Sequence, residues 1–159
     1  VILSLLMYLI TLSGFFVLLF YYSFTHNLNV GLYWDLKSLL IILFPTITLS
    51  FASFKINDIK TAFVTAFSSS YDEHSLRVGI DVFSFMKTIS IACGALGTLA
   101  NWIAMFFSAG FRSEQTNHYE TLGIYLGLSM ITMFYGIFIA FLIFEPMKFH
   151  LKREFDKHC

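Results

Sequence analysis

Residues 129–146 read SMITMFYGIFIAFLIFEP, an apolar stretch of about the length that crosses the hydrocarbon layer of a membrane as a helix. Its small and polar residues are not scattered, because Ser129, Thr132, Gly136 and Ala140 recur at intervals of three and four. That spacing places them on one face of a helix. The stretch therefore predicts an apolar helix that carries a narrow stripe of small and polar side chains.

A second stretch has the same pattern. One helical face contains Ser90, Gly94, Gly97, Asn101 and Ser108, with Thr98 at its edge. Close helix packing is one explanation, since small residues let two backbones approach. A polar lining that faces a pore or a partner helix is the other. Asn101 favours the lining. A buried Ser or Thr can bond a carbonyl of its own helix, whereas a buried amide needs other hydrogen-bond partners.

The composition indicates a membrane protein. Of the 159 residues, 57% are hydrophobic and only 13% are charged, whereas soluble domains contain roughly 25% charged residues. The formal net charge is zero, and no basic block suggests a nucleic-acid partner. We therefore expect lipid around this chain and no nucleic acid.

Four apolar runs can be drawn, each near the ~20 residues that a transmembrane helix needs. They cover residues 1–22, 36–54, 82–107 and 122–144. We expect an all-α, polytopic protein with these four transmembrane helices in a single membrane domain, 1–159. The first run has no basic segment before it and no small-residue cleavage site after it, so we expect a retained helix.

The connecting segments predict the orientation. Segments 55–81 and 145–159 together contain seven Lys and Arg residues, whereas 23–35 and 108–121 contain only Arg112. This asymmetry places both termini in the cytoplasm. Segment 55–81 is too short for an independent core and is expected to hold one amphipathic helix, with Ile56, Ile59, Ala62 or Phe63, and Phe67 on its apolar face. Segment 145–159 reads as a cytoplasmic tail that continues the fourth helix.

Catalytic and metal chemistry are not indicated. The five histidines are scattered over both expected sides of the membrane, and the two cysteines, Cys93 and Cys159, suggest neither a disulfide nor a metal site. No Ser or Cys has a plausible base beside it. We expect no enzyme and no cofactor.

Every acidic residue lies at or beyond the end of an expected span, so no carboxylate of this chain is expected to carry an ion at mid-membrane. Asp81 and Glu145 flank the cytoplasmic ends of the third and fourth helices. Local ion pairs with Arg77 and Lys148 are one interpretation. A cytoplasmic exit for an ion, formed by Asp81, Glu145 and Pro146, is the other.

Three segments resemble the MotA/TolQ/ExbB proton-channel family. LGTLANWIAMF, from Leu96, is similar to its third helix, with Gly94, Leu96, Gly97 and Thr98 matching the pattern G-x-L-G-T. TMFYGIFIAFLIFEPM is similar to the fourth helix, with matches at Thr132, Tyr135, Gly136, Ala140 and Pro146. WDLKSLLIILFPTITLSF resembles the second helix, with matches at Asp35, Ser38 and Thr46.

The resemblance implies a subunit of an ion-driven motor, or stator, in the bacterial cytoplasmic membrane. Five copies would surround the single helices of a two-copy MotB/TolR/ExbD-like partner that carries the ion-binding Asp. The third and fourth helices would line the path, with these residues exposed to it: Gly94, Gly97, Thr98, Asn101, Ser129, Thr132, Met133 and Gly136. The ion would be H⁺, or Na⁺, since Met133 stands where the family has a hydroxyl. The family's large cytoplasmic domain is reduced here to 55–81, which argues against flagellar torque.

Two other classes of protein fit the sequence. The chain could be a four-helix accessory or scaffold subunit, in which case the stripes only pack helices. It could also be a small transporter that acts alone. Against the transporter, the sequence has no internal repeat and is expected to have no charge inside the membrane.

Overall fold

The computed structural model describes residues 35–67, 72–111 and 118–158, together with positions 10, 13, 14, 17, 18, 21 and 25. The helix expected at 1–22 otherwise lies outside the described residues. Over the three continuous ranges the chain is all-α, with these elements in order: α2 (Leu36–Ser53), α3 (Ile56–Phe67), α4 (Glu73–Phe111), α5 (His118–Ile139), the π-helix η2 (Ala140–Phe144) and α6 (Glu145–His158).

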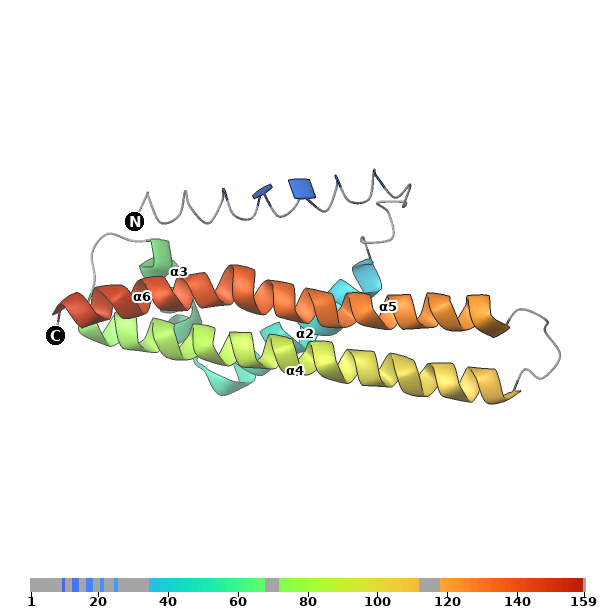
Figure 1. Ribbon diagram of the computed structural model, residues 1–159. Coiled ribbons are helices and arrows are strands. Elements are labelled where there is room, and N and C mark those ends of the chain that lie inside the picture. The colour runs from blue at the N-terminus through green and yellow to red at the C-terminus, as the bar shows by residue number, and fades with distance from the viewer. Residues whose placement is uncertain are drawn as a thin grey trace.

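Helix α4 runs antiparallel to α5, η2 and α6, which follow one another in nearly one line (Figure 1). Its 39 residues correspond to a length of about 58 Å, well beyond the ~30 Å of hydrocarbon. The helix begins at Glu73 rather than near residue 82. The early start follows from packing, because Leu76 is buried and a Cβ at Gly79 would lie 2.5 Å from Cδ1 of Leu151 in α6.

Helix α2 packs against this pair with a face that is mostly polar. Its N-cap is Asp35, whose carboxylate accepts a hydrogen bond from the backbone N–H of Lys37 (3.1 Å). The buried positions recur every four residues: Ser38, Ile42, Thr46 and Ser50. Large apolar residues such as Phe44 and Ile47 point away from the other helices and are exposed. We assign that outer face to lipid.

The π-helix η2 lies directly before Pro146. The N–H of Glu145 donates to the carbonyl of Ala140, five residues earlier, instead of the usual four. Pro146 has no N–H, and its ring crowds the carbonyl four residues before it. The wider π-turn relieves that crowding, and the helix therefore continues through α6 to His158.

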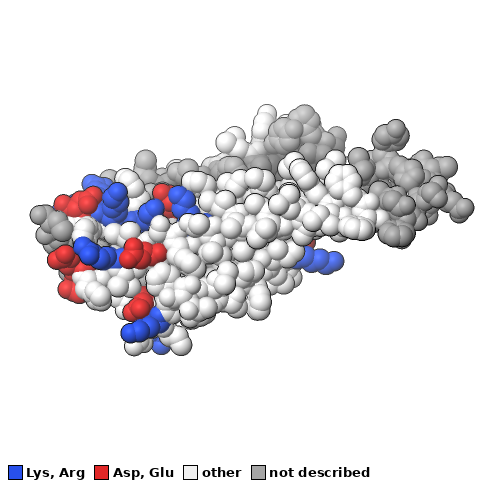
Figure 2. All heavy atoms as spheres, turned by 90° about the horizontal axis from the view of Figure 1, so that it is seen from below, with Lys and Arg blue, Asp and Glu red and all other residues white. Residues whose placement is uncertain are grey.

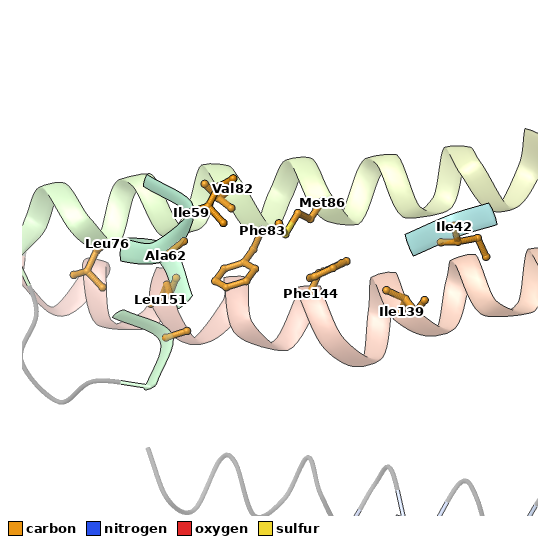
Figure 3. Close-up of a cluster of buried hydrophobic side chains, with 11 residues drawn as sticks. Ile42, Ile59, Ala62, Leu76, Val82, Phe83, Met86, Ile139, Phe144 and Leu151 are labelled. Carbon is orange, nitrogen blue, oxygen red and sulfur yellow. The ribbon is translucent and has the colours of Figure 1, made fainter. Parts of the chain in front are cut away.

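Helix α3 closes one end of the bundle. It buries Ile59, Ala62, Thr65 and Ala66. Ile56 and Phe67, expected on the buried face, are exposed. Figure 3 shows the apolar cluster beneath α3, where Phe83 of α4 and Phe144 of η2 face each other with ring centroids 6.4 Å apart. Phe83 also meets the ring edge of Phe63.

Three helical segments among the described residues are long and apolar enough to cross a membrane: Leu36–Ser53, Glu73–Phe107 and Ser129–Lys157. Figure 2 shows that most charged side chains on the face in view gather at one end of the molecule, while uncharged atoms cover the middle. Helix α6 and the beginning of α4 lie at the same end in Figure 1. This charged end is where the basic segments 55–81 and 145–159 come together.

Candidate functional site

Helices α4 and α5 touch through two glycines. A Cβ placed on Gly94 would lie 3.0 Å from the Cα of Gly136. A Cβ on Gly136 would lie 2.9 Å from the Cα of Gly94 and 2.8 Å from the carbonyl oxygen of Ser90. The obstructing atoms belong to backbone, which cannot swing aside. The two glycines therefore set the smallest separation between the helices.

Helix α2 joins this contact one turn further along α4. A Cβ on Gly97 would lie 2.7 Å from Cγ2 of Thr132 in α5 and 3.2 Å from Cγ2 of Ile41 in α2. Three helices thus converge on one line of small and polar residues. We call this line the polar seam. Its members are Ser38 and Thr46 of α2, Ser90, Gly94, Gly97, Thr98 and Asn101 of α4, and Ser129, Thr132 and Gly136 of α5.

Thr132 is the junction of the hydrogen bonds in the seam. Its side chain is fully buried, and its Oγ1 lies 2.8 Å from Oγ of Ser38. The amide of Asn101 donates to the same Oγ1 over 3.3 Å. Ser38 in turn donates to the carboxylate of Asp35 over 2.6 Å. A continuous chain of polar groups therefore runs from Asp35, at the N-terminal end of α2, to the side chain of Asn101.

Two further hydrogen bonds tie α4 to α5. Thr98 Oγ1 donates to the carbonyl of Gly94 in its own helix (2.9 Å) and contacts that of Ser129 in α5 (3.1 Å). The indole N–H of Trp102 donates to Oγ of Ser129 over 2.8 Å. Each hydroxyl in this part of the seam is thus satisfied within the subunit.

The seam continues toward the charged end with a weaker contact. The hydroxyls of Thr46 in α2 and Ser90 in α4 lie 3.3 Å apart, and both side chains are buried. Thr46 also donates to the carbonyl of Ile42 over 2.7 Å. Such a bond within one helix satisfies the hydroxyl without a partner helix.

Most of the predicted site residues lie inside the subunit. The buried ones are Gly94, Gly97, Thr98, Ser129, Thr132 and Gly136. Asn101 is half-buried, and Met133 is 41% exposed. The two stripes face each other, which is the packing arrangement that the sequence left as one alternative. Met133 belongs instead to an exposed stripe on α5 and η2, formed by Met130, Met133, Ile137 and Phe141.

Sequence reasoning missed Ser38, Thr46 and Trp102 as members or neighbours of the site. A signal for the first two was present, since Ser38, Thr46 and Ser50 share one face of an apolar helix, as the residues of the other stripes do. Trp102 had no such signal. Its partner lies on another helix.

The charged end of the helix pair formed by α4 and α5–η2–α6 differs from the expectation in its charge pairs and in the presence of Lys87. Glu145 pairs with Lys87 of α4, whose Nζ lies 2.7 Å from its Oε2, and not with Lys148. Arg77 lies over the ring of Phe155, while Asp81 is exposed. Pro146, half-buried, follows Glu145 directly.

The second difference is that a charged residue, Lys87, lies within an apolar run. It lies inside the run 82–107 and within the apolar span that begins at Glu73. Lys87 is thus a charged residue within an apolar run, which the expectation of no charge inside the membrane overlooked. An isolated lysine in an apolar run was visible in the sequence, but its partner was not, because Glu145 lies on the neighbouring helix. Within the described ranges no group of three or more His, Cys, Asp or Glu residues lies close enough to hold a metal ion.

Comparisons with known proteins agree with this architecture. The sequence profile of the MotA/TolQ/ExbB proton channel family matches residues 53–159. The solved structure of the flagellar MotAB stator complex from Bacillus subtilis contains a chain with the same fold, with a TM-score of 0.71 and 15% sequence identity. The match covers 99% of the present chain and 83% of that chain. No curated protein sequence matches the chain.

Proposed function

Because the chain belongs to the MotA/TolQ/ExbB proton channel family, we propose that it is the ion-conducting subunit of a membrane motor. In this proposal five copies form a ring in the bacterial cytoplasmic membrane around two single-helix partner chains, with both termini of each copy in the cytoplasm. Helices α4 and α5 face the partner. The ion is H⁺, with Na⁺ as the alternative.

The polar seam is the observation that carries this proposal. Asp35, Ser38, Thr132 and Asn101 are linked by contacts of 2.6, 2.8 and 3.3 Å. Polar groups inside a membrane are costly, and they often mark the routes of ions or substrates. The seam offers hydroxyl and amide groups of the kind that ligate a transported ion.

The seam also indicates what the partner must supply. A transmembrane potential delivers about 2.3 kcal/mol per elementary charge per 100 mV, and a motor uses it by loading and unloading a titratable group. In the described parts of α2, α4 and α5, the carboxylate that joins the seam is Asp35, and its oxygens already accept hydrogen bonds from Ser38 and from the backbone N–H of Lys37 as the cap of α2. We therefore assign the central ion-binding carboxylate to the partner helix, at the level of Thr98 and Thr132.

The exposed stripe is the surface we assign to that helix. Met130, Met133, Ile137 and Phe141 follow one another at three- and four-residue intervals and form an exposed apolar stripe among the residues that the structure describes. The glycines of the seam hold α4 against the back of this surface. Thr98 and Thr132 are buried between α4 and α5, so in this proposal the helices must move for their hydroxyls to reach the ion.

Purification from native membranes tests the assembly. We expect a mass of five copies plus two copies of a chain with one transmembrane helix and one Asp in it. Changing that Asp to Asn should abolish ion flux into membrane vesicles and leave the complex intact, since the amide keeps the shape and loses the titration. A ring that conducts ions without a partner, or a partner helix without a carboxylate, would refute the proposal.

A scaffold subunit without ion conduction is the second candidate. The burial of both stripes inside one subunit favours it, because close packing alone explains Gly94 and Gly136. Oligomeric mass separates the two candidates. A monomer, or a hetero-complex without a central partner helix, would support the scaffold.

A further inference from the structure

Lys87 is a partly exposed cation within the apolar run of α4. Its ammonium lies 2.7 Å from the carboxylate of Glu145, and the two side chains are 22% and 36% exposed. Glu145 Oε2 makes no hydrogen bond, so the two groups meet as an ion pair at an angle outside the hydrogen-bond range. Ionisable residues inside a membrane are costly and are found paired, mostly where they act on an ion or substrate.

An aromatic ring completes the surroundings of the ammonium. Lys87 Nζ lies 4.8 Å from the centroid of Phe141, within the range of a cation–π interaction. Phe141 belongs to the exposed stripe, and Glu145 follows it by one turn. The carboxylate and the ring face thus form a small cation site at the charged end of that stripe, and the chain's own ammonium occupies it.

A purely structural tie between α4 and α6 is the simpler interpretation of this pair. Three features of its place argue for more. The pair is only partly covered, it ends the surface that the proposed function assigns to the partner helix, and it adjoins the π-helix. π-Turns inside helices occur frequently at functional sites.

We propose that Glu145 and Phe141 form the last cation site on the ion's route to the cytoplasm, and that Lys87 is a tethered cation that competes for it. This inference rests on the proposed function. A proton, or Na⁺, that leaves the partner's carboxylate reaches Glu145 when Lys87 swings away. When the ion moves on to the cytoplasm, Lys87 returns and closes the site. Glu145 therefore promotes flux, whereas Lys87 restrains it.

The two residues consequently act in opposite directions, which a structural tie cannot produce. We expect Lys87→Met to raise the H⁺ flux, because it removes the cation that competes for Glu145 and for the ring of Phe141. Glu145→Gln should lower it by about tenfold or more, since the amide no longer binds a proton. The measurement uses inverted membrane vesicles that contain the chain with its co-purifying partner, with a pH-sensitive dye inside.

A second pair in the same chain provides the matched control. Lys157 and Glu154 form an exposed ion pair on α6, 2.6 Å apart. Lys157→Met and Glu154→Gln remove the same charges and should leave the flux unchanged. A third variant, Phe141→Leu, retains both charges of the Lys87 pair and removes the ring. Because the ring is part of the proposed site for the transported ion, we expect Phe141→Leu to lower the flux, in the opposite direction to Lys87→Met, and it keeps the proposal testable if the lysine variant does not fold.

The results distinguish a failure of this inference from a failure of the proposed function. Flux that falls in both Lys87→Met and Glu145→Gln, and returns in the charge-reversed double variant K87E/E145K, would reduce the pair to a structural tie. Flux that is unchanged in both would overturn the inference as well. A wild-type complex with no flux above that of the partner's Asp→Asn variant would refute the proposed function, and with it this inference.

Discussion

The hydroxyls of Ser38 and Thr132 lie 2.8 Å apart, although 94 positions separate the two residues in the chain. Both side chains are buried, and Ser38 also reaches the carboxylate of Asp35. This contact joins α2 to α5 through polar groups at a place where an apolar contact would also fill the space. The seam is therefore both a packing interface and a line of polar ligands, and substitutions can separate the two roles.

Thr132→Val should preserve assembly and reduce ion-dependent function. Valine keeps nearly the same shape, so the loss of stability should be about 1 kcal/mol, the value of one or two hydrogen bonds between membrane helices. Ser38 keeps its bond to Asp35. Thermal unfolding and vesicle flux measure the two effects. Thr48→Val is the control, because Thr48 is exposed and bonds only carbonyls of its own helix. Full flux in Thr132→Val would leave the seam with packing alone.

Gly136→Ala should disrupt the subunit even though it adds a single methyl group. The new Cβ would meet two backbone atoms at 2.8 and 2.9 Å, so the helices must separate, and overpacking of this kind typically costs about 1–3 kcal/mol. Gly127→Ala is the matched control on the same helix, since no atom lies within 4 Å of its added Cβ. We expect it to unfold at or slightly above the wild-type temperature. Equal unfolding temperatures for both variants would contradict the close contact.

Asp35 combines two roles that substitutions can divide. Asp35→Asn should retain the helix cap and lose little stability, because Asn caps a helix as well as Asp does. Asp35→Ala removes the cap bond to Lys37 and the bond from Ser38, which should cost about 1 kcal/mol. Calorimetry of the purified complex compares the two. A loss in Asp35→Asn as large as in Asp35→Ala would show that the charge, and not the cap, stabilises this end of α2.

Thiol labelling at two exposed lysine positions, at opposite ends of the spans, measures the orientation of the chain in the membrane. In a background without Cys93 and Cys159, Lys37→Cys should react with an impermeant thiol reagent added to intact cells. Lys152→Cys should react only after the membrane is opened, because the basic segments are expected on the cytoplasmic side. Labelling of Lys152→Cys alone in intact cells would invert the proposed topology.

Local pattern was sufficient for the helical class of the described elements and for which small and polar residues share a face. Ser90, Gly94 and Thr98 share a face because they recur at helical spacing, and that spacing depends only on the backbone geometry of a helix. The apolar runs likewise predicted the membrane class, and three long apolar helices are present among the described residues. The family resemblance, stated from three short segments, is confirmed by the profile match.

Local pattern was insufficient wherever two helices meet. That the stripes of α4 and α5 face each other, that Thr132 bonds Ser38, and that Lys87 selects Glu145 all depend on how the helices are rotated and how far each is shifted along its neighbour. The start of α4 at Glu73 depends on Leu151 of α6 in the same way. The periodicity of one helix contains no information about the rotation of the next. Periodicity therefore determined which residues share a face, and only the tertiary packing decided which faces meet.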